Sequence, residues 1–250
     1  MIRVRLDQLV FDKRLAPSRE RAKAVVLAGL VRVNGEVVSK AGTLVDAGAD
    51  VTLDAPDHPY VGRGGLKLAH AFDAFGITVA GREALDVGAS TGGFTDVLLQ
   101  RGAARVVALD VGHGQLDWRL RNDPRVVVIE HFNARYLTLA DLPGPVDVVV
   151  IDVSFISLRQ ILPAVAAILR VDADVVALVK PQFEAGRDEV RKGIIRDPAV
   201  HARVLAEVTA ASAEVGLTRV GSTPSPITGQ KGNVEFLLHL RPASAGHSRV

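Results

Sequence analysis

The segment LDVGASTGGFTD, residues 85–96, decides the fold. It joins a short apolar run, which favours a strand, to a stretch with helical spacing of its apolar residues. Gly88, Gly92 and Gly93 allow the backbone to turn sharply and approach a ligand, and the following helix directs its N-terminus at the same place. The segment therefore predicts the first strand, turn and helix of a ligand-binding α/β domain, although its spacing is not that of the G-x-G-x-x-G phosphate loop.

Short apolar runs alternate with helical patterns from residue 84 to the end of the chain, which predicts a mostly parallel sheet covered on both faces. The last strand follows its predecessor after a loop and not a helix, which favours an antiparallel orientation for it. The expected strands are 84–88, 105–110, 126–130, 146–152, 174–180, 218–223 and 234–240, and the clearest helical patterns are 94–102, 158–170 and 198–216.

The first sixty residues have a different organisation. Residues 5–15 have helical spacing, and a second helix is expected between an N-cap at Pro17-Ser18 and a stop at Gly29. Asn34-Gly35 is a strong hairpin signal, and 47–53 is expected to form another short strand.

Residues 1–40 carry nine Lys or Arg against four acids, whereas the rest carries 21 basic and 24 acidic residues. A positive end on a nearly neutral body favours a polyanionic partner.

Composition excludes several classes of protein. The chain of 250 residues has no cysteine, which excludes disulfides and cysteine-based zinc sites or nucleophiles, and no metal site is expected. Its seven histidines show no helical i, i+4 pair of the zinc-protease type. No apolar run approaches the roughly 18–20 residues of a membrane helix, and the charged N-terminus is unlike a secretion signal. We therefore expect a soluble cytoplasmic protein and, since no oligomerisation motif is visible, a monomer.

Unusual polar residues follow several predicted strands. Asp152 and Lys180 end two strands, Lys67 precedes the sheet, and Glu235 starts the last strand. The carboxyl ends of parallel strands form one crevice, and an antiparallel last strand would start at that same edge. Two surface salt bridges would account for the same spacing. Asp110 ends the second strand, where a carboxylate can hold ribose hydroxyls.

One rival interpretation is a serine hydrolase, because Gly88 to Gly92 literally matches the G-x-S-x-G nucleophile elbow with Ser90 as nucleophile. Asp152 and either His201 or His239 would then complete a triad. The elbow of a hydrolase normally follows several strands, whereas this one ends the first strand of its domain.

The N-terminal pattern resembles the S4 RNA-binding domain, over about residues 3–55, as carried by SRERAKAVVLAGLVRVNGEVVSKAG. The resemblance implies binding of structured RNA, with Arg3, Arg5, Arg19 and Lys40 as candidate phosphate contacts. Phosphate contacts supply affinity and register, not sequence discrimination.

The whole chain is similar to the TlyA family of S4–FtsJ rRNA methyltransferases, also labelled haemolysin A. The stretches GRGGLKL, DVGASTGGFTDVLL, ALDVGHGQL, RNDPRVVVIE, DVSFISL, LVKPQFE and GNVEF carry the match. Gly62 departs from it, since family members often have Ser in this loop, and the chain ends soon after its last strand. The implied fold is a Rossmann-like α/β methyltransferase domain, with a seven-stranded mostly parallel sheet whose last strand is antiparallel, preceded by a small α+β S4-like domain.

The resemblance also implies a reaction, the transfer of a methyl group from S-adenosylmethionine to a ribose 2′-hydroxyl of ribosomal RNA, expected to be of a cytidine. Lys67, Asp152, Lys180 and Glu235 look like the K-D-K-E tetrad of FtsJ-like enzymes. Lys180 would be the general base, which requires its neutral form; burial and the charge of Lys67 favour that form, whereas the two acids oppose it. Positioning alone, with water taking the proton, is the other route.

The cofactor is expected on the glycine turn and the next two strand ends, at Asp86, Gly88, Ser90, Thr91, Gly92, Gly93, Phe94, Asp110 and Asn133. Loop capping is an equally good role for Asn133. Arg63 and Arg135 flank the expected crevice and are candidate substrate-phosphate contacts, with solvated surface arginines as the alternative.

The expected domains are 1–56 for the S4-like module, 57–62 for a linker, 63–242 for the methyltransferase and 243–250 for a flexible tail. Two alternatives remain besides the hydrolase. The first is an RNA-binding ribosome-assembly factor with an inactive methyltransferase fold. The second is a membrane-lytic protein, which no apolar span in the sequence supports. The sequence does not identify the modified nucleotide or the ribosomal subunit.

Overall fold

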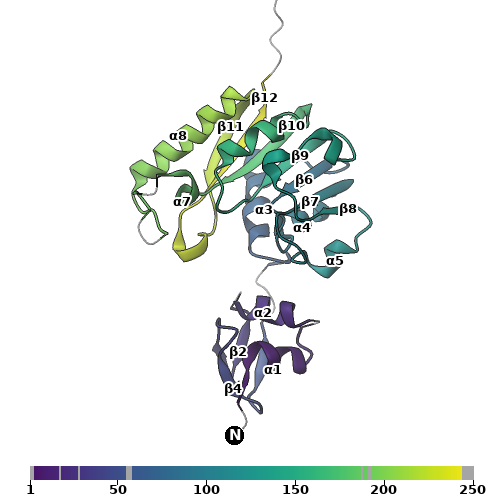
Figure 1. The fold of residues 1–250 in the computed structure, drawn as a ribbon, viewed down its shortest axis with the longest axis vertical. Coiled ribbons are helices and arrows are strands. Elements are labelled where there is room, and N and C mark those ends of the chain that lie inside the picture. The colour runs from purple at the N-terminus through teal and green to yellow at the C-terminus, as the bar shows by residue number, and fades with distance from the viewer. Residues whose placement is uncertain are drawn as a thin grey trace, which may run out of the picture. The chain divides into compact units, whose positions relative to one another are not determined.

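The computed structural model describes residues 3–16, 18–27, 29–54, 58–186, 188–190 and 193–243. The chain divides into two compact units, one ending at Pro59 and the other starting at Tyr60 (Figure 1). Pro17, part of the expected linker and nearly all of the expected tail lie outside the described residues. Each unit is described by itself.

The first unit contains two short helices and two small sheets around its own core. The helices are α1 (Leu6–Asp12) and α2 (Arg19–Leu27), and the strands are β1 (Arg3–Arg5), β2 (Val31–Val33), β3 (Glu36–Val37), β4 (Leu44–Asp46) and β5 (Val51–Leu53). β2 lies between β3 and β5, and β1 pairs with β4. Asn34 and Gly35 have φ of 50° and 84°, as a tight hairpin turn requires. Leu6, Val26 and Val31 are among the fully buried residues of this core.

Local signals located most of these elements, but pairing partners were harder to predict. The Ser18 hydroxyl oxygen accepts the N–H of Arg21 at 3.1 Å, as expected of a residue capping α2. The β1–β4 pair was not predicted, because a three-residue strand shows no periodicity and takes its hydrogen bonds from a partner forty residues away. The expected strand 47–53 is confined to Val51–Leu53.

The second unit is built on one sheet of seven strands, in the order β11-β12-β10-β9-β6-β7-β8. β12 alone runs in the direction opposite to the other six strands, so the predicted fold class, including the antiparallel last strand, is confirmed. The strands are β6 (Glu83–Val87), β7 (Arg105–Leu109), β8 (Val126–Ile129), β9 (Val146–Ile151), β10 (Leu169–Val179), β11 (Leu217–Pro224) and β12 (Phe236–Pro242). The helices are α3 (Gly64–Phe75), α4 (Gly93–Gln100), α5 (Trp118–Arg121), α6 (Leu162–Ala166), α7 (Pro181–Glu184) and α8 (Pro198–Glu214).

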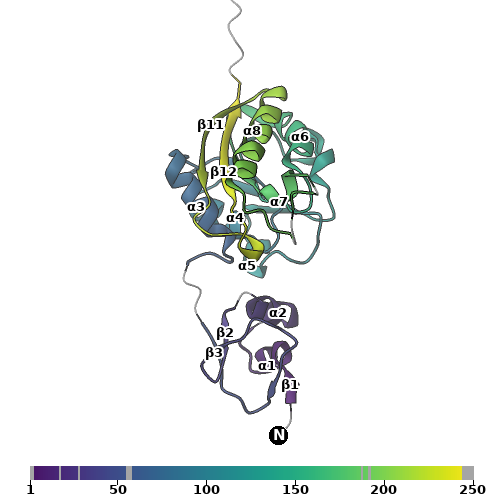
Figure 2. The same cartoon turned by 90° about the vertical axis from the view of Figure 1, so that its left-hand side faces the viewer.

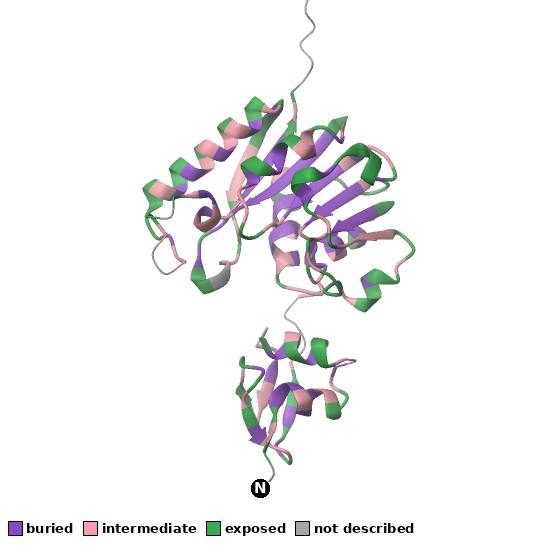
Figure 3. Cartoon of the chain, in the orientation of Figure 1, coloured by how far each residue is buried: buried purple, intermediate pink, exposed green. Residues whose placement is uncertain are grey.

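The sheet separates two hydrophobic cores. Alternate residues of each central strand belong to opposite cores: in β9, Val149 and Ile151 face one and Val148 and Val150 the other. Helices α6 and α8 cover the first core and α3 and α4 the second, so the sheet lies between two helical layers (Figure 2). The central strands are almost entirely buried, as Figure 3 shows. A sheet buried on both faces holds the strand ends, where polar residues gather, in fixed positions.

Two elements of this unit differ from expectation. Helix α3 was not predicted, because its Gly-Gly start resembles a loop. The helix expected over 158–170 is limited to a 3₁₀ turn (Leu158–Gln160) and α6, and β10 already begins at Leu169, which pairs with Val146. A short apolar run cannot be assigned to a helix or a buried strand by periodicity alone. Among the described residues, no helix is long and apolar enough to cross a membrane.

Candidate active site

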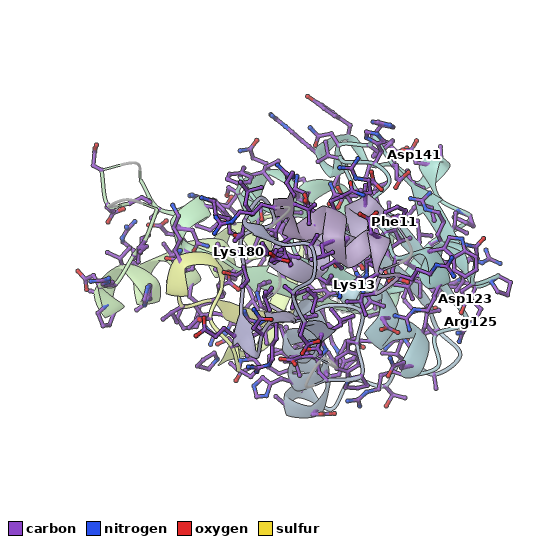
Figure 4. All side chains as sticks on the ribbon, turned by 90° about the horizontal axis from the view of Figure 1, so that it is seen from below. Phe11, Lys13, Asp123, Arg125, Asp141 and Lys180 are labelled. Carbon is purple, nitrogen blue, oxygen red and sulfur yellow. The ribbon has the colours of Figure 1, made fainter. Side chains whose placement is uncertain are left out.

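Four charged side chains meet at the carboxyl edge of the sheet. Lys180 directly follows β10, Asp152 directly follows β9, and Glu235 directly precedes β12. The last antiparallel pair of β10 and β12 is Val179 with Phe236, so Lys180 and Glu235 lie one residue beyond it on neighbouring strands. Lys67 comes from the first turns of α3. Lys180 is labelled in Figure 4.

These four residues form two ion pairs. The Nζ atom of Lys180 lies 2.6 Å from Oδ1 of Asp152, and the Nζ atom of Lys67 donates to Oε2 of Glu235 at 2.5 Å. Glu235 is buried, and its carboxylate lies so close to Gly229 that a Cβ there would be 1.9 Å from Oε1. These are not loose surface salt bridges, because the side chain of Lys67 is 10% exposed and that of Lys180 only 11%.

Ser154 and Phe155 extend the site beyond the four charges. Besides its ion pair with Asp152, Lys180 donates a hydrogen bond to the hydroxyl of Ser154 at 3.0 Å. Phe155 is 87% exposed, and the centroid of its ring lies 5.0 Å from that of Phe183. Neither Ser154 nor Phe155 is among the site residues that the sequence predicts. A signal was present for both, since each lies within three residues of Asp152.

The glycine turn lies directly beside the ion pairs. A Cβ on Gly88 would be 2.5 Å from the carbonyl oxygen of Asp152, so only glycine allows the turn to approach β9 so closely. Gly88 and Gly92 have φ of 88° and 96°, and Ser90 has 48°. On Gly92 a Cβ would overlap Leu120. The turn therefore presents bare backbone next to Asp152.

Asp110 joins the turn to the loop after β7. Its carboxylate accepts the N–H of Ser90 at 2.8 Å and the N–H of Gly112 at 2.7 Å, and the Ser90 hydroxyl donates to Gln115. Asn133 caps the 3₁₀ turn that follows β8, accepting the N–H of Arg135 at 3.1 Å. The loop-capping alternative for Asn133 is therefore seen.

Asp86 lies beneath the turn and is completely buried. Its Oδ2 accepts a hydrogen bond from the Thr95 hydroxyl at 2.6 Å, but Oδ1 has no hydrogen-bond partner among the described residues. Burial, with the nearby charges of Asp152 and Asp110, raises the pKa of Asp86 to about 7 despite the Thr95 hydrogen bond. A buried acceptor without a donor and a glycine-lined turn suit a polar ligand with hydrogen-bond donors.

Within the described part of the chain, the remaining predicted site residues form no hydrogen bond or ion pair with the four charged side chains. The Phe94 ring lies in the core against α3, which leaves only its backbone for a cofactor. Thr91 is half-buried and Gly93 buried, packed on the backbone of Gly65. Arg63 and Arg135 are exposed, and Arg135 lies 5.9 Å from the ring centroid of Tyr136.

The residues proposed for a serine hydrolase are not brought together. His239 hydrogen-bonds Asp174 at 2.8 Å, His201 contacts the carbonyl oxygen of Ile195, and Asp152 pairs with Lys180. None of these contacts involves Ser90, so the hydrolase interpretation is wrong in its geometry.

The reversed β12 in a parallel sheet, the glycine turn after β6 and the acid after β7 define a Rossmann-like domain for a nucleoside-containing ligand. Residues 60–242 match the FtsJ-like methyltransferase family, and residues 4–51 match the S4 domain. The chain therefore belongs to the FtsJ-like methyltransferases that carry an S4 domain, the TlyA family.

Relatives match over most of the chain. The 16S/23S rRNA (cytidine-2′-O)-methyltransferase TlyA of Mycobacterium tuberculosis is 50% identical over 96% of this chain and 90% of that protein. Hemolysin A of Brachyspira hyodysenteriae is 46% identical over 95% of this chain and 99% of its own. The solved structure of a Streptococcus thermophilus protein, 48% identical, covers 97% of this chain and 90% of its own with a TM-score of 0.78.

Proposed function

We propose that the protein transfers the methyl group of S-adenosylmethionine to the ribose 2′-hydroxyl of a cytidine in ribosomal RNA. The observation that carries the proposal is the pair of ion pairs, Lys180 with Asp152 and Lys67 with Glu235, at the sheet edge beside the glycine turn. The S4 domain and the activity named for the Mycobacterium tuberculosis relative support the choice of ribosomal RNA.

The glycine turn and the acids around it are suited to the cofactor. The turn, from Gly88 to Gly93, would present its backbone to the methionine part, and the buried Oδ1 of Asp86, in the strand just before the turn, is an acceptor without a donor among the described residues. Asp110 is assigned to the ribose hydroxyls and Asn133 to the adenine side. When bound, S-adenosylmethionine supplies an electrophilic methyl group.

Lys180 then acts on the proton of the ribose hydroxyl. A neutral amine at Nζ would accept that proton as the oxygen attacks, and Asp152 and Ser154 fix the amine by the contacts at 2.6 and 3.0 Å. The Lys67–Glu235 pair is a second polar element beside Lys180 at the sheet edge, buried enough to keep its geometry when RNA binds. Arg63 and Arg135 would hold phosphates near the target nucleotide.

The exposed ring of Phe155 suits an unstacked base. Enzymes that modify a nucleotide inside a folded RNA must take it out of its stack, and aromatic side chains stabilise the displaced base. Phe155 follows Ser154 directly and is held against Phe183, so a base stacked on it would have its ribose near Lys180.

The test measures methyl transfer from labelled S-adenosylmethionine to unmodified ribosomal subunits and to their free RNA. Wild type should methylate a ribose 2′-oxygen. Lys180→Ala should lose this activity, and so should Lys180→Arg, because a guanidinium keeps the charge beside Asp152 but does not give up a proton. An active Lys180→Arg variant would instead indicate that the lysine acts only by its charge.

The alternative is an RNA-binding assembly factor without methyltransferase activity. Folded wild type that binds S-adenosylhomocysteine in calorimetry but methylates neither subunit nor free RNA would favour it. The intact pairs around Lys180 and Lys67 argue for the enzyme.

A further inference from the structure

A buried carboxylate outside the four charged residues connects the two loops on which Asp152 and Lys180 lie. Glu184 ends α7, four residues after Lys180, and only 2% of its side chain is exposed. Its Oε2 accepts a hydrogen bond from the Ser157 hydroxyl at 2.5 Å, and its Oε1 accepts the backbone N–H of Leu158 at 2.7 Å. Ser157 and Leu158 belong to the loop that starts at Asp152.

Arg159 completes the environment of this carboxylate. Its Nε lies 3.6 Å from Oε2 of Glu184, and its Nη2 donates to the backbone oxygen of Glu184 at 2.9 Å. A buried charge is tolerated only when hydrogen-bonded and paired, and Glu184 meets both conditions. All of its partners lie on the loop after β9, so its interactions serve that one junction.

Strand pairing reaches only the first residue of this loop, where the N–H of Asp152 donates to the carbonyl oxygen of Val87 at 2.9 Å. The pairing of β9 with β10 ends at Ile151 and Ala177, before either Asp152 or Lys180 is reached. Among the described residues, no backbone-to-backbone hydrogen bond involves 153–156. Val153 and Ile156 pack against the hydrophobic core, and the polar contacts of the loop are at its start, by Asp152 and Ser154, and at its far end, by Glu184.

We propose that Glu184 is a positioning residue for the methyl transfer: it ties the Asp152 loop to the α7 turn and so keeps Asp152 and Ser154 at hydrogen-bond distance from Lys180. This inference rests on the proposed function. The two loops then meet at four places, the Lys180–Asp152 pair, the Lys180–Ser154 hydrogen bond, the Phe155–Phe183 rings and the Glu184 contacts. Loss of the last leaves the reacting groups present but less well aligned, and small misplacements cost large factors in rate.

The variants Glu184→Gln and Glu184→Ala test this role, with Glu207→Gln as the matched control. Glutamine keeps an oxygen for the N–H of Leu158 but loses the charge facing Arg159, whereas alanine loses every side-chain contact. Glu207 lies on α8 and also contacts Arg159, at 3.8 Å, but accepts no hydrogen bond from Ser157 or Leu158, which both donate to Glu184. The rate constant at saturating RNA and cofactor should fall about 10-fold in Glu184→Gln and about 100-fold in Glu184→Ala. Glu207→Gln should match wild type.

Two further measurements separate positioning from a general loss of structure. Affinity for S-adenosylhomocysteine should change less than about threefold in both Glu184 variants, since the glycine turn and Asp110 are untouched. Amide exchange followed by mass spectrometry, without RNA, should become faster in the peptide that contains Leu158, because the N–H of Leu158 donates to Glu184. A rate constant equal to wild type in a variant whose loop exchanges faster would overturn the positioning role.

Unchanged amide exchange in Glu184→Ala would show that Glu184 does not hold the loop. A parallel loss of rate and cofactor affinity would also overturn the proposal, because it would indicate a collapsed site. If wild type methylated no ribosomal RNA, the proposed function would fail, and the amide exchange would still decide whether Glu184 holds the loop.

Discussion

At the residue scale, the site depends on single residues in crowded or buried positions. A Cβ at Gly88 would clash with the carbonyl oxygen of Asp152. Asp86 is buried, and one of its carboxylate oxygens has no hydrogen-bond partner among the described residues. The sequence marks both as members of a glycine-rich turn. It does not show that Gly88 touches Asp152, which is 64 residues away along the chain. This closeness links the cofactor turn to the ion pairs.

Substitution of Gly88 by alanine should abolish binding of S-adenosylhomocysteine, measured by calorimetry. Gly81→Ala is the matched control, since Gly81 also has a positive φ, of 76°, but a Cβ there has no neighbour within 4 Å. In Gly81→Ala, backbone strain alone should lower the free energy of unfolding, by about 1–2 kcal/mol, and the affinity for S-adenosylhomocysteine should stay unchanged. Equal affinities in the two variants would contradict the steric argument.

Asp86 should make the stability of the ligand-free protein depend on pH. Its pKa is about 7 when folded against 3.8 for a free carboxyl, so between these values the folded protein binds more protons than the unfolded chain. Stability from this group is present below pH 4 and is lost as the pH rises toward 7. Asp86→Asn lacks this titration.

The difference in unfolding free energy, Asp86→Asn minus wild type, should thus rise between pH 4 and 7 and then level off, with an upper limit of roughly 4 kcal/mol. Urea unfolding at four pH values measures it. A difference that stays constant with pH would show that the carboxyl is already charged at pH 5.

At the element scale, β10 carries two charged clusters, one at the active site and one within the strand. Its carboxyl end is followed by Lys180, and Asp174, midway along it, is buried. Asp174 accepts hydrogen bonds from His239 at 2.8 Å, from Arg82 at 2.7 Å and from Arg241 at 2.7 Å, which ties β10 to β12 and to the turn before β6. Periodicity predicted the strand but not this junction, because its partners come from distant segments.

Asp174→Asn should destabilise the protein by about 3 kcal/mol or more, since removal of one member of a buried charge cluster leaves its partners uncompensated. Burial opposes ionisation of Asp174, but the hydrogen bonds from His239, Arg82 and Arg241 outweigh it and hold its pKa well below the usual range. The stability from Asp174 is therefore present at neutral pH and is lost only in strong acid.

Urea unfolding at pH 7 measures this loss. Asp73→Asn, which removes the exposed pair with Arg101, is the control and should cost less than about 1 kcal/mol. Similar losses in both variants would mean that the Asp174 cluster adds nothing beyond a surface pair.

At the scale of the whole molecule, two units with separate cores have separate tasks in the proposed function. The first unit carries the predicted phosphate contacts. Arg5 is engaged in a two-hydrogen-bond pair with Asp7, at 2.6 and 3.0 Å, whereas Arg3, Arg19 and Lys40 form no ion pair with described residues. We therefore expect Arg19 and Lys40 to be better placed than Arg5 to neutralise phosphates.

Arg19→Ala and Lys40→Ala should each weaken binding to ribosomal RNA and lower the slope of log affinity against log salt by about one. Affinity for S-adenosylhomocysteine should not change. Arg203→Ala is the control, because Arg203 is paired with Glu189 and Glu207 in the second unit. Binding titrations at several salt concentrations measure the slopes. A slope unaffected by either substitution would remove these residues from the RNA contact.

The sequence by itself determined the fold class, the reversed last strand and the family, because periodicity, glycine turns and the spacing of motifs are local properties of the chain. It also selected Lys67, Asp152, Lys180 and Glu235 as a set. Only the tertiary structure decided which lysine pairs with which acid, that Ser154 contacts Lys180, and that Glu184 holds the loop after Asp152. These contacts join residues from different strands and loops, and their distances are set by how the sheet and its helices pack.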